Sequence, residues 1–150
     1  GYTLALLKKD FGGVIMIELL NTTQQTIAVG GSVVFDKKVV QTGCCECHRN
    51  NTPAVKMNQR GYYEVTFNGN IGGATAGTAV QIALQLGGAT LPETTMISVP
   101  AAANDLNNVS ASTFLVNCCD DYNRITVVNT GTVPVIVGAN ASIKLKRVCG

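Results

Sequence analysis

Tryptophan is absent from this sequence, histidine occurs once, and charged residues are few. The 150 residues contain no Trp, a single His and 13% Asp, Glu, Lys and Arg. No Gly-x-Ser-x-Gly, phosphate-binding glycine loop or helix-borne histidine pair is present. The carboxylates are scattered and only Asp120 and Asp121 are adjacent, whereas a glycosidase needs two acids facing one groove. We therefore expect a protein that is not an enzyme.

Long apolar runs and basic clusters are also missing. No apolar stretch reaches the roughly 20 residues that cross a bilayer, so we expect no membrane span. The formal net charge of +2 is spread along the chain without a run of Lys or Arg and without interleaved aromatic residues. That distribution argues against nucleic acid as a partner. The first residues lack the order of a secretory signal, so we expect any export to use another route.

The chain does contain a two-residue alternation of apolar and polar side chains, bounded by Gly, Asn, Thr and Pro. Between positions 80 and 86, a core would receive Val80, Ile82, Leu84 and Leu86, while the intervening Gln side chains face water. Residues 61–67 alternate in the same way. Further strands are predicted at 27–29, 32–35, 54–57, 96–99, 110–116, 124–129, 133–137 and 141–148, and loops at 72–77 and 101–108. Short strands without intervening helices predict an all-β, two-sheet antiparallel sandwich of the jelly-roll kind.

The chain divides into an N-terminal extension, residues 1–15, and a jelly-roll domain, residues 16–150. The extension carries Leu4, Leu6 and Leu7, which the sandwich does not need for completion. Two interpretations are open. Either Met16 is the native start and the preceding residues arise from processing or gene calling, or the apolar arm reaches into the next subunit and adds a strand to an exposed edge.

Cysteine is frequent, with six residues in 150, and this indicates an oxidising, extracellular destination. Vicinal cysteines rarely bridge to each other without strain, so we expect partners elsewhere in the fold or in neighbouring subunits. A cysteine near the chain end suits an intermolecular bridge. The disulfide candidates are Cys44, Cys45, Cys47, Cys118, Cys119 and Cys149.

One string has a more specific chemical meaning. Cys44-x-x-Cys47-His48 matches the spacing at which two thiols hold a haem covalently and the adjacent His ligates its iron. A zinc or other soft-metal ion could instead bind Cys44, Cys47 and His48 together with Cys118 or Cys119. Disulfide bonding is the competing interpretation of the same thiols, and under it no cofactor is expected.

Several segments, taken in order, resemble the globular head of the complement-q and tumour-necrosis-factor (TNF) family. They are Gly31-Ser-Val-Val-Phe35, Gly61-Tyr-Tyr-Glu-Val-Thr-Phe67 and residues 80–87, 109–115, 125–128 and 141–147. The likeness is to bacterial or phage versions, such as the C-terminal heads of collagen-like spore-surface proteins. A weaker one is to disulfide-linked endospore-appendage subunits. The resemblance implies a ten-stranded jelly roll that forms compact trimers through an apolar sheet edge.

Together these features lead to three hypotheses of function. The first is a structural subunit, a disulfide-reinforced homotrimer that forms a fibre on, or decorates, a spore, cell or virion surface. The second is a head that binds a host receptor or glycan with a surface including Tyr62 and Tyr122. The third is a haem-carrying electron-transfer subunit that uses the Cys44-x-x-Cys47-His48 string.

Overall fold

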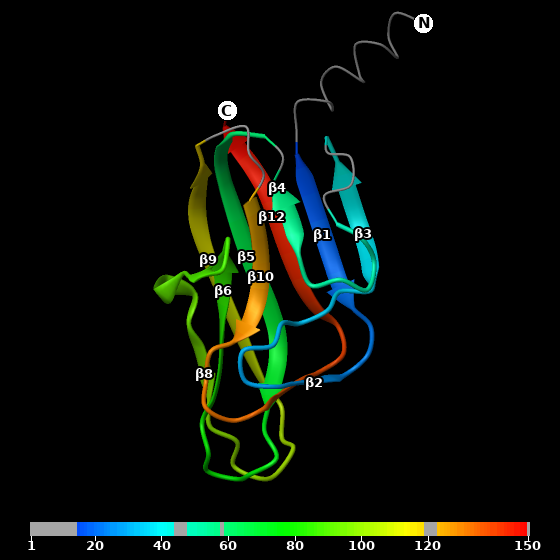
Figure 1. Ribbon diagram of the computed structural model, residues 1–150. Helices are drawn as coiled ribbons and strands as arrows, with labels where there is room; N and C mark the ends of the chain where they lie inside the picture. Colours follow the sequence, from blue (N-terminus) through cyan, green and yellow to red (C-terminus); the bar gives the residue numbers. More distant parts are fainter. Residues whose placement is uncertain (1–14, 44–47, 58, 119–122, 150) are drawn as a thin grey trace, which may run out of the picture.

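Two antiparallel β-sheets packed face to face make up the computed structural model of this chain (Figure 1). The structure describes residues 15–43, 48–57, 59–118 and 123–149. The all-β jelly-roll prediction is confirmed: within these ranges there are twelve strands and one short 3-10 turn, η1 (Pro92–Thr94). No described helix is long and apolar enough to cross a membrane.

The larger sheet has seven strands, and its long central strand is β5. On one side β5 pairs with β9 over eleven consecutive positions, and on the other it pairs with β12 and, near its end, β11. From β12 the sheet continues through β1 to β3, and from β11 to β2. The seven strands are β1 (Met16–Asn21), β2 (Gln25–Ile27), β3 (Lys37–Thr42), β5 (Gly61–Gly72), β9 (Asn107–Asn117), β11 (Val135–Val137) and β12 (Ala141–Cys149).

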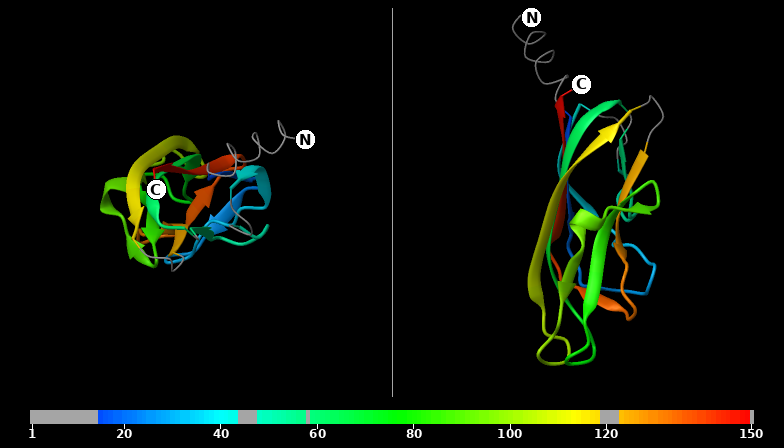
Figure 2. Two further views of the ribbon diagram at one scale, coloured as in Figure 1. Left: turned by 90° about the horizontal axis from the view of Figure 1, so that it is seen from above. Right: turned by 90° about the vertical axis from the view of Figure 1, so that its left-hand side faces the viewer.

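The smaller sheet has five strands in the order β4-β10-β6-β7, with β8 also paired to β6. It lies over the inner face of the larger sheet, and the two layers are seen in the right-hand view of Figure 2. Its strands are β4 (Val55–Met57), β6 (Val80–Leu86), β7 (Ala89–Thr90), β8 (Met96–Ser98) and β10 (Asn123–Asn129).

The core forms between the sheets from the alternation that the sequence displays. Tyr63, Val65 and Phe67 of β5 are fully buried, and their neighbours in sequence point away from the core. In β6 the predicted inward residues Val80, Ile82 and Leu84 are likewise fully buried, whereas Leu86 is only partly covered at the strand end.

Several strands differ from the sequence prediction. β2 spans 25–27 where 27–29 is predicted, and β1 and β7 coincide with no predicted strand. The predicted strand 32–35 makes only two isolated bridges, Ser32 to Val128 and Phe35 to Thr52. The regular strand is β3, which follows directly and pairs with β1 at the sheet edge, with a bulge beside Glu18. Its side chains are exposed or partly exposed, so β3 lacks the buried alternation by which strands are recognised in a sequence.

Of the predicted N-terminal extension, residues 1–15, only Ile15 lies within the described residues, so the roles of Leu4, Leu6 and Leu7 stay predictions. Ile15 is buried, and its carbonyl accepts a hydrogen bond of 2.9 Å from the Arg147 N–H. The chain therefore enters the sandwich beside the end of β12, where β1 and β12 pair as antiparallel neighbours.

A buried polar side chain, Asn129, joins the last residue of β10 to two other parts of the fold. Its amide nitrogen donates to the carbonyls of Ile27 (3.0 Å) and Val133 (2.9 Å), and its side-chain oxygen accepts from the Gly131 N–H (2.9 Å). The side chain is 1% exposed. Because each polar atom is satisfied, the desolvation cost of burying the amide is offset.

We expect Asn129→Ala to lower the free energy of unfolding by roughly 2–4 kcal/mol, because the substitution leaves buried carbonyls and an N–H without partners. Urea unfolding followed by circular dichroism measures the change. Asn50→Ala, at an exposed position outside the strands, is the control and should change stability by less than about 0.5 kcal/mol. Equal effects of the two substitutions would contradict the role assigned to Asn129.

Candidate functional site

The outer face of the larger sheet, which points away from the core, carries exposed apolar side chains at one end. β5 and β9 are in register there, with Tyr62 opposite Val116 and Glu64 opposite Phe114. The inward neighbours Tyr63 and Leu115 belong to the core. Directly opposed residues on one face of an antiparallel pair lie within contact distance, so the outward side chains form one continuous surface.

Beside Glu64, that surface carries apolar side chains where solvent exposure would favour polar ones. Phe114 is 70% exposed, Tyr62 55% and Val116 52%. Val148 lies at a bulge of β12 between Arg147 and Cys149, beside the residue that pairs with Tyr62, and is also exposed. We call these four residues the outer-face patch. Single exposed apolar residues are ordinary, but grouped ones indicate an interaction surface.

A polar region borders the outer-face patch along the same two strands. The Thr66 and Ser112 hydroxyl oxygens lie 3.0 Å apart. Further along, the Asn108 amide donates to the side-chain oxygens of Asn68 (3.1 Å) and Asn70 (3.2 Å). These groups satisfy one another without water, so they can enter a protein interface at small desolvation cost.

The two described cysteines lie at the same end of the larger sheet as the outer-face patch. Cys118 directly follows β9, Cys149 ends β12, and both are exposed. The first residues of β5 lie between them, since Gly61 pairs with Asn117 and Tyr62 with Cys149. Two strand spacings separate them by about 10 Å, which is beyond the reach of a disulfide between their Cα atoms.

The other four cysteines, Cys44, Cys45, Cys47 and Cys119, lie outside the described residues, and so does Tyr122. Their disulfide, zinc and haem assignments stay predictions. Within the described part of the chain, no group of three or more His, Cys, Asp or Glu side chains could hold a metal ion. Tyr62, the other tyrosine of the predicted recognition surface, is exposed as that prediction requires.

His48, the predicted haem or zinc ligand, is buried at 3% exposure. Nδ1 lies 2.9 Å from the carbonyl oxygen of Ala54, and Nε2 lies 3.0 Å from that of Phe35. Both ring nitrogens face a carbonyl oxygen, and a neutral imidazole, which has one N–H, donates to one of the two. In this arrangement His48 joins the 48–54 segment to the 32–35 segment, and a metal bond to either nitrogen would replace one of these contacts.

We expect His48→Ala to lower the free energy of unfolding by about 2–4 kcal/mol, since a backbone carbonyl loses its donor and a buried ring is removed. Chemical unfolding of metal-free protein measures this loss in the absence of any ligand. Asn50→Ala, in the same segment but exposed, should be close to neutral. A loss of less than about 0.5 kcal/mol for His48→Ala would contradict the structural role.

Comparison with known proteins places this geometry in a fold class. No family model and no curated protein matches the sequence. Solved structures that match over most of the chain are globular domains of the complement-q and TNF type, and they show that the fold is the jelly roll of that class.

Three of these structures illustrate the likeness. The globular domain of zebrafish complement 1qA protein has a TM-score of 0.61 at 10% identity and covers 88% of this chain and 94% of its own. Eiger TNF from S. frugiperda has a TM-score of 0.62 at 13% identity, covering 90% and 92%. Murine APRIL at pH 5.0 has a TM-score of 0.60 at 13% identity, covering 90% and 99%.

Proposed function

We propose that this protein is a non-enzymatic structural subunit that assembles with copies of itself into a homotrimer outside the cell. The observation that carries the proposal is the outer-face patch, which groups Phe114, Tyr62, Val116 and Val148 at one end of an exposed sheet. A second copy of the chain is the partner that the fold class favours, because the family that the sequence resembles forms compact trimers through an apolar sheet edge.

The energetics favour an interface larger than the patch alone. Burying a Phe side chain stabilises an interface by roughly 1.5–3 kcal/mol, but a stable interface covers about 800 Å² on each partner. We therefore expect the polar region of Thr66, Ser112 and Asn108 to be covered as well. An apolar centre with a polar, internally hydrogen-bonded border is the usual composition of such an interface.

An edge-to-face contact between subunits supports a threefold arrangement over a twofold one. In a dimer with twofold symmetry the patch would face its own copy, whereas a trimer packs one subunit's sheet edge against the face of the next. Strand β9 forms that edge of the larger sheet, and Phe114 and Val116 are on it. An edge strand is also where unpaired backbone groups gain most from being covered.

We expect Val116→Ser and Phe114→Ser to shift the protein from trimer to monomer, because each removes apolar area from the interface, by roughly 1–3 kcal/mol per subunit. Size-exclusion chromatography with light scattering, over a dilution series, measures the mass. Val29→Ser is the matched control: Val29 is 53% exposed, against 52% for Val116, and lies outside the patch. A monomeric parent protein, or a Phe114→Ser variant that stays trimeric, would overturn the proposal.

We further propose that disulfides reinforce the assembly on a spore, cell or virion surface, as in a fibre or a decoration. Cys118 and Cys149 support this, because both are exposed and both lie at one end of the sheet. Exposed thiols near an interface are positioned to reach a neighbouring subunit, and links of this kind would keep a multimer together at any dilution.

Non-reducing gel electrophoresis of the full chain tests the covalent links. We expect bands at multiples of the subunit mass that collapse to one band on reduction, and we expect Cys149→Ser to shorten the series. Mass spectrometry of the non-reduced digest identifies the partners. A single monomer band with and without reductant would count against covalent assembly, without affecting the noncovalent trimer tested above.

A further inference from the structure

A hollow of about 300 Å³ lies on the outer face of the larger sheet, and we call it the central hollow. Strands β1, β3, β5 and β12 contribute to it. A cavity of about 150 Å³ is enough to hold a benzene ring, so this hollow has room for one aromatic side chain. Its lining residues are Met16, Ile17, Glu18, Val40, Glu64, Thr66, Lys144, Leu145 and Lys146.

The strand register places the central hollow beside the outer-face patch. In one row of outward side chains, Phe114 of β9 is opposite Glu64 of β5, which is opposite Lys146 of β12. Met16 of β1 follows Lys146 in the same row. Because neighbouring strands lie about 4.8 Å apart, two spacings put the backbone of Phe114 about 10 Å from that of Lys146. The hollow therefore adjoins the patch on one continuous face.

Apolar groups form part of the wall of the central hollow. Met16 is half-buried and Val40 is 42% exposed, although both are apolar. The two lysines add methylene stems, which can cover apolar surface while their ammonium groups stay in water. An apolar side chain placed in the hollow would remove these groups from water, and such burial is favourable.

The charged groups of the central hollow are arranged in pairs of opposite sign. The Nζ atom of Lys144 lies 3.8 Å from a carboxylate oxygen of Glu18, and Lys146 is directly opposite Glu64 on paired strands. Covering a charge beside its counter-charge costs less than covering an unpaired one. Ammonium groups also attract the face of an aromatic ring. The hollow is therefore suited to an aromatic side chain.

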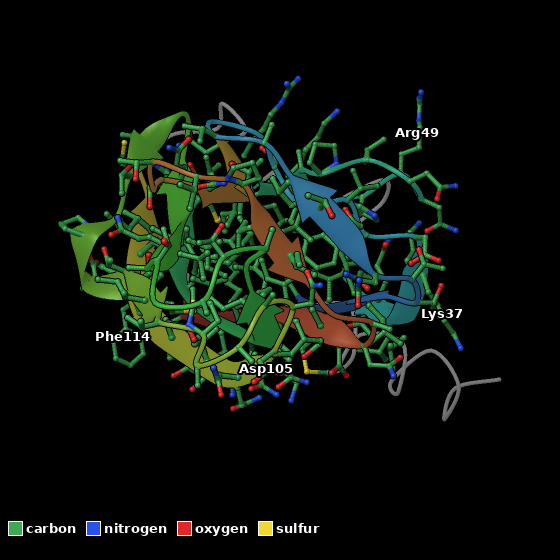
Figure 3. All side chains as sticks on the ribbon, turned by 90° about the horizontal axis from the view of Figure 1, so that it is seen from below. Lys37, Arg49, Asp105 and Phe114 are labelled. Carbon is green, nitrogen blue, oxygen red and sulfur yellow. The ribbon has the colours of Figure 1, made fainter. Side chains whose placement is uncertain are left out.

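Phe114 is an aromatic side chain that its own subunit leaves uncovered. At 70% it is the most exposed of the described large apolar residues, so it does not occupy the hollow of its own subunit. It projects from β9, whereas Lys37 is on β3 at the other edge of the sheet, and the two lie at opposite margins of the molecule (Figure 3). A side chain at the margin of one copy can reach the middle of another copy's face.

We propose that Phe114 of one copy inserts into the central hollow of the next copy. This inference rests on the self-association proposed above, and it names the surface that receives the outer-face patch. The projecting side chain and the hollow are different sites on one subunit, so the contact is heterologous, and a closed ring of copies fills every hollow. A twofold contact between two patches would leave both hollows empty.

Two neighbouring valines provide a matched pair of variants. Val40 and Val39 are adjacent on β3 and are 42% and 51% exposed, but Val39 is not among the described residues that line the hollow. We expect Val40→Trp to fill the hollow and to raise the concentration at which the trimer dissociates at least about tenfold, the equivalent of one Phe side chain left unburied. Val39→Trp adds the same side chain outside the hollow and should raise it less than about twofold.

Sedimentation velocity of the full chain over a dilution series measures the midpoint of dissociation. A double-mutant cycle then shows whether Phe114 and the hollow meet each other. Phe114→Ser should raise the midpoint at least about tenfold in the parent chain, but no more than about twofold further in the Val40→Trp chain, where the ring is already displaced. Circular dichroism checks that each variant is folded, and Val40→Arg fills the same hollow if the Trp variant does not fold.

Two results would overturn the insertion and leave the trimer in place. They are equal midpoints for Val40→Trp and Val39→Trp, and additive effects of Phe114→Ser and Val40→Trp. A parent chain that is monomeric at every concentration would overturn the proposed function and this inference together. The mass of the parent chain therefore distinguishes the two failures.

Discussion

Strand β5 pairs along both edges, and the alternation of its side chains constrains the whole sandwich. On one edge its register with β9 runs unbroken from Gly61 to Ile71, and on the other it holds β12 and β11. A slip by one residue would put Glu64 into the core and Phe67 into solvent, which the buried face does not allow. The same register that fills the core therefore also fixes which side chains of β9 face outward.

The part of the fold that could be predicted is the part in which burial alternates along the chain. Tyr63, Val65 and Phe67 are visible as an inward series in the sequence and are fully buried in the structure. β3 is an edge strand whose side chains are exposed or partly exposed, so the sequence shows no alternation that predicts it. The apolar residues around Phe35 predict a strand, but this segment makes only isolated bridges, with Phe35 buried in the core.

The candidate surfaces were harder to predict, because they depend on positions that only the fold brings together. In β9 the three consecutive residues Phe114, Leu115 and Val116 are all apolar. The sequence therefore shows no alternation that indicates which of them faces out. The spacing before His48 is compatible with a haem or zinc ligand motif as well as with disulfide bonding of the neighbouring cysteines. The two backbone partners of His48, at Phe35 and Ala54, come from different segments, and spacing contains no information about them.

The arrangement of the chain gives the domain two unlike ends. β1 and β5 begin at the end where β9 and β12 finish (Figure 1), and the exposed Cys118 and Cys149 are there. The opposite end consists of turns, including residues 73–79 and 138–140. A subunit attached through its cysteine-bearing end would present these turns at its far, solvent-facing end. A foreign peptide spliced into residues 73–79 would be displayed there without interrupting any strand pairing.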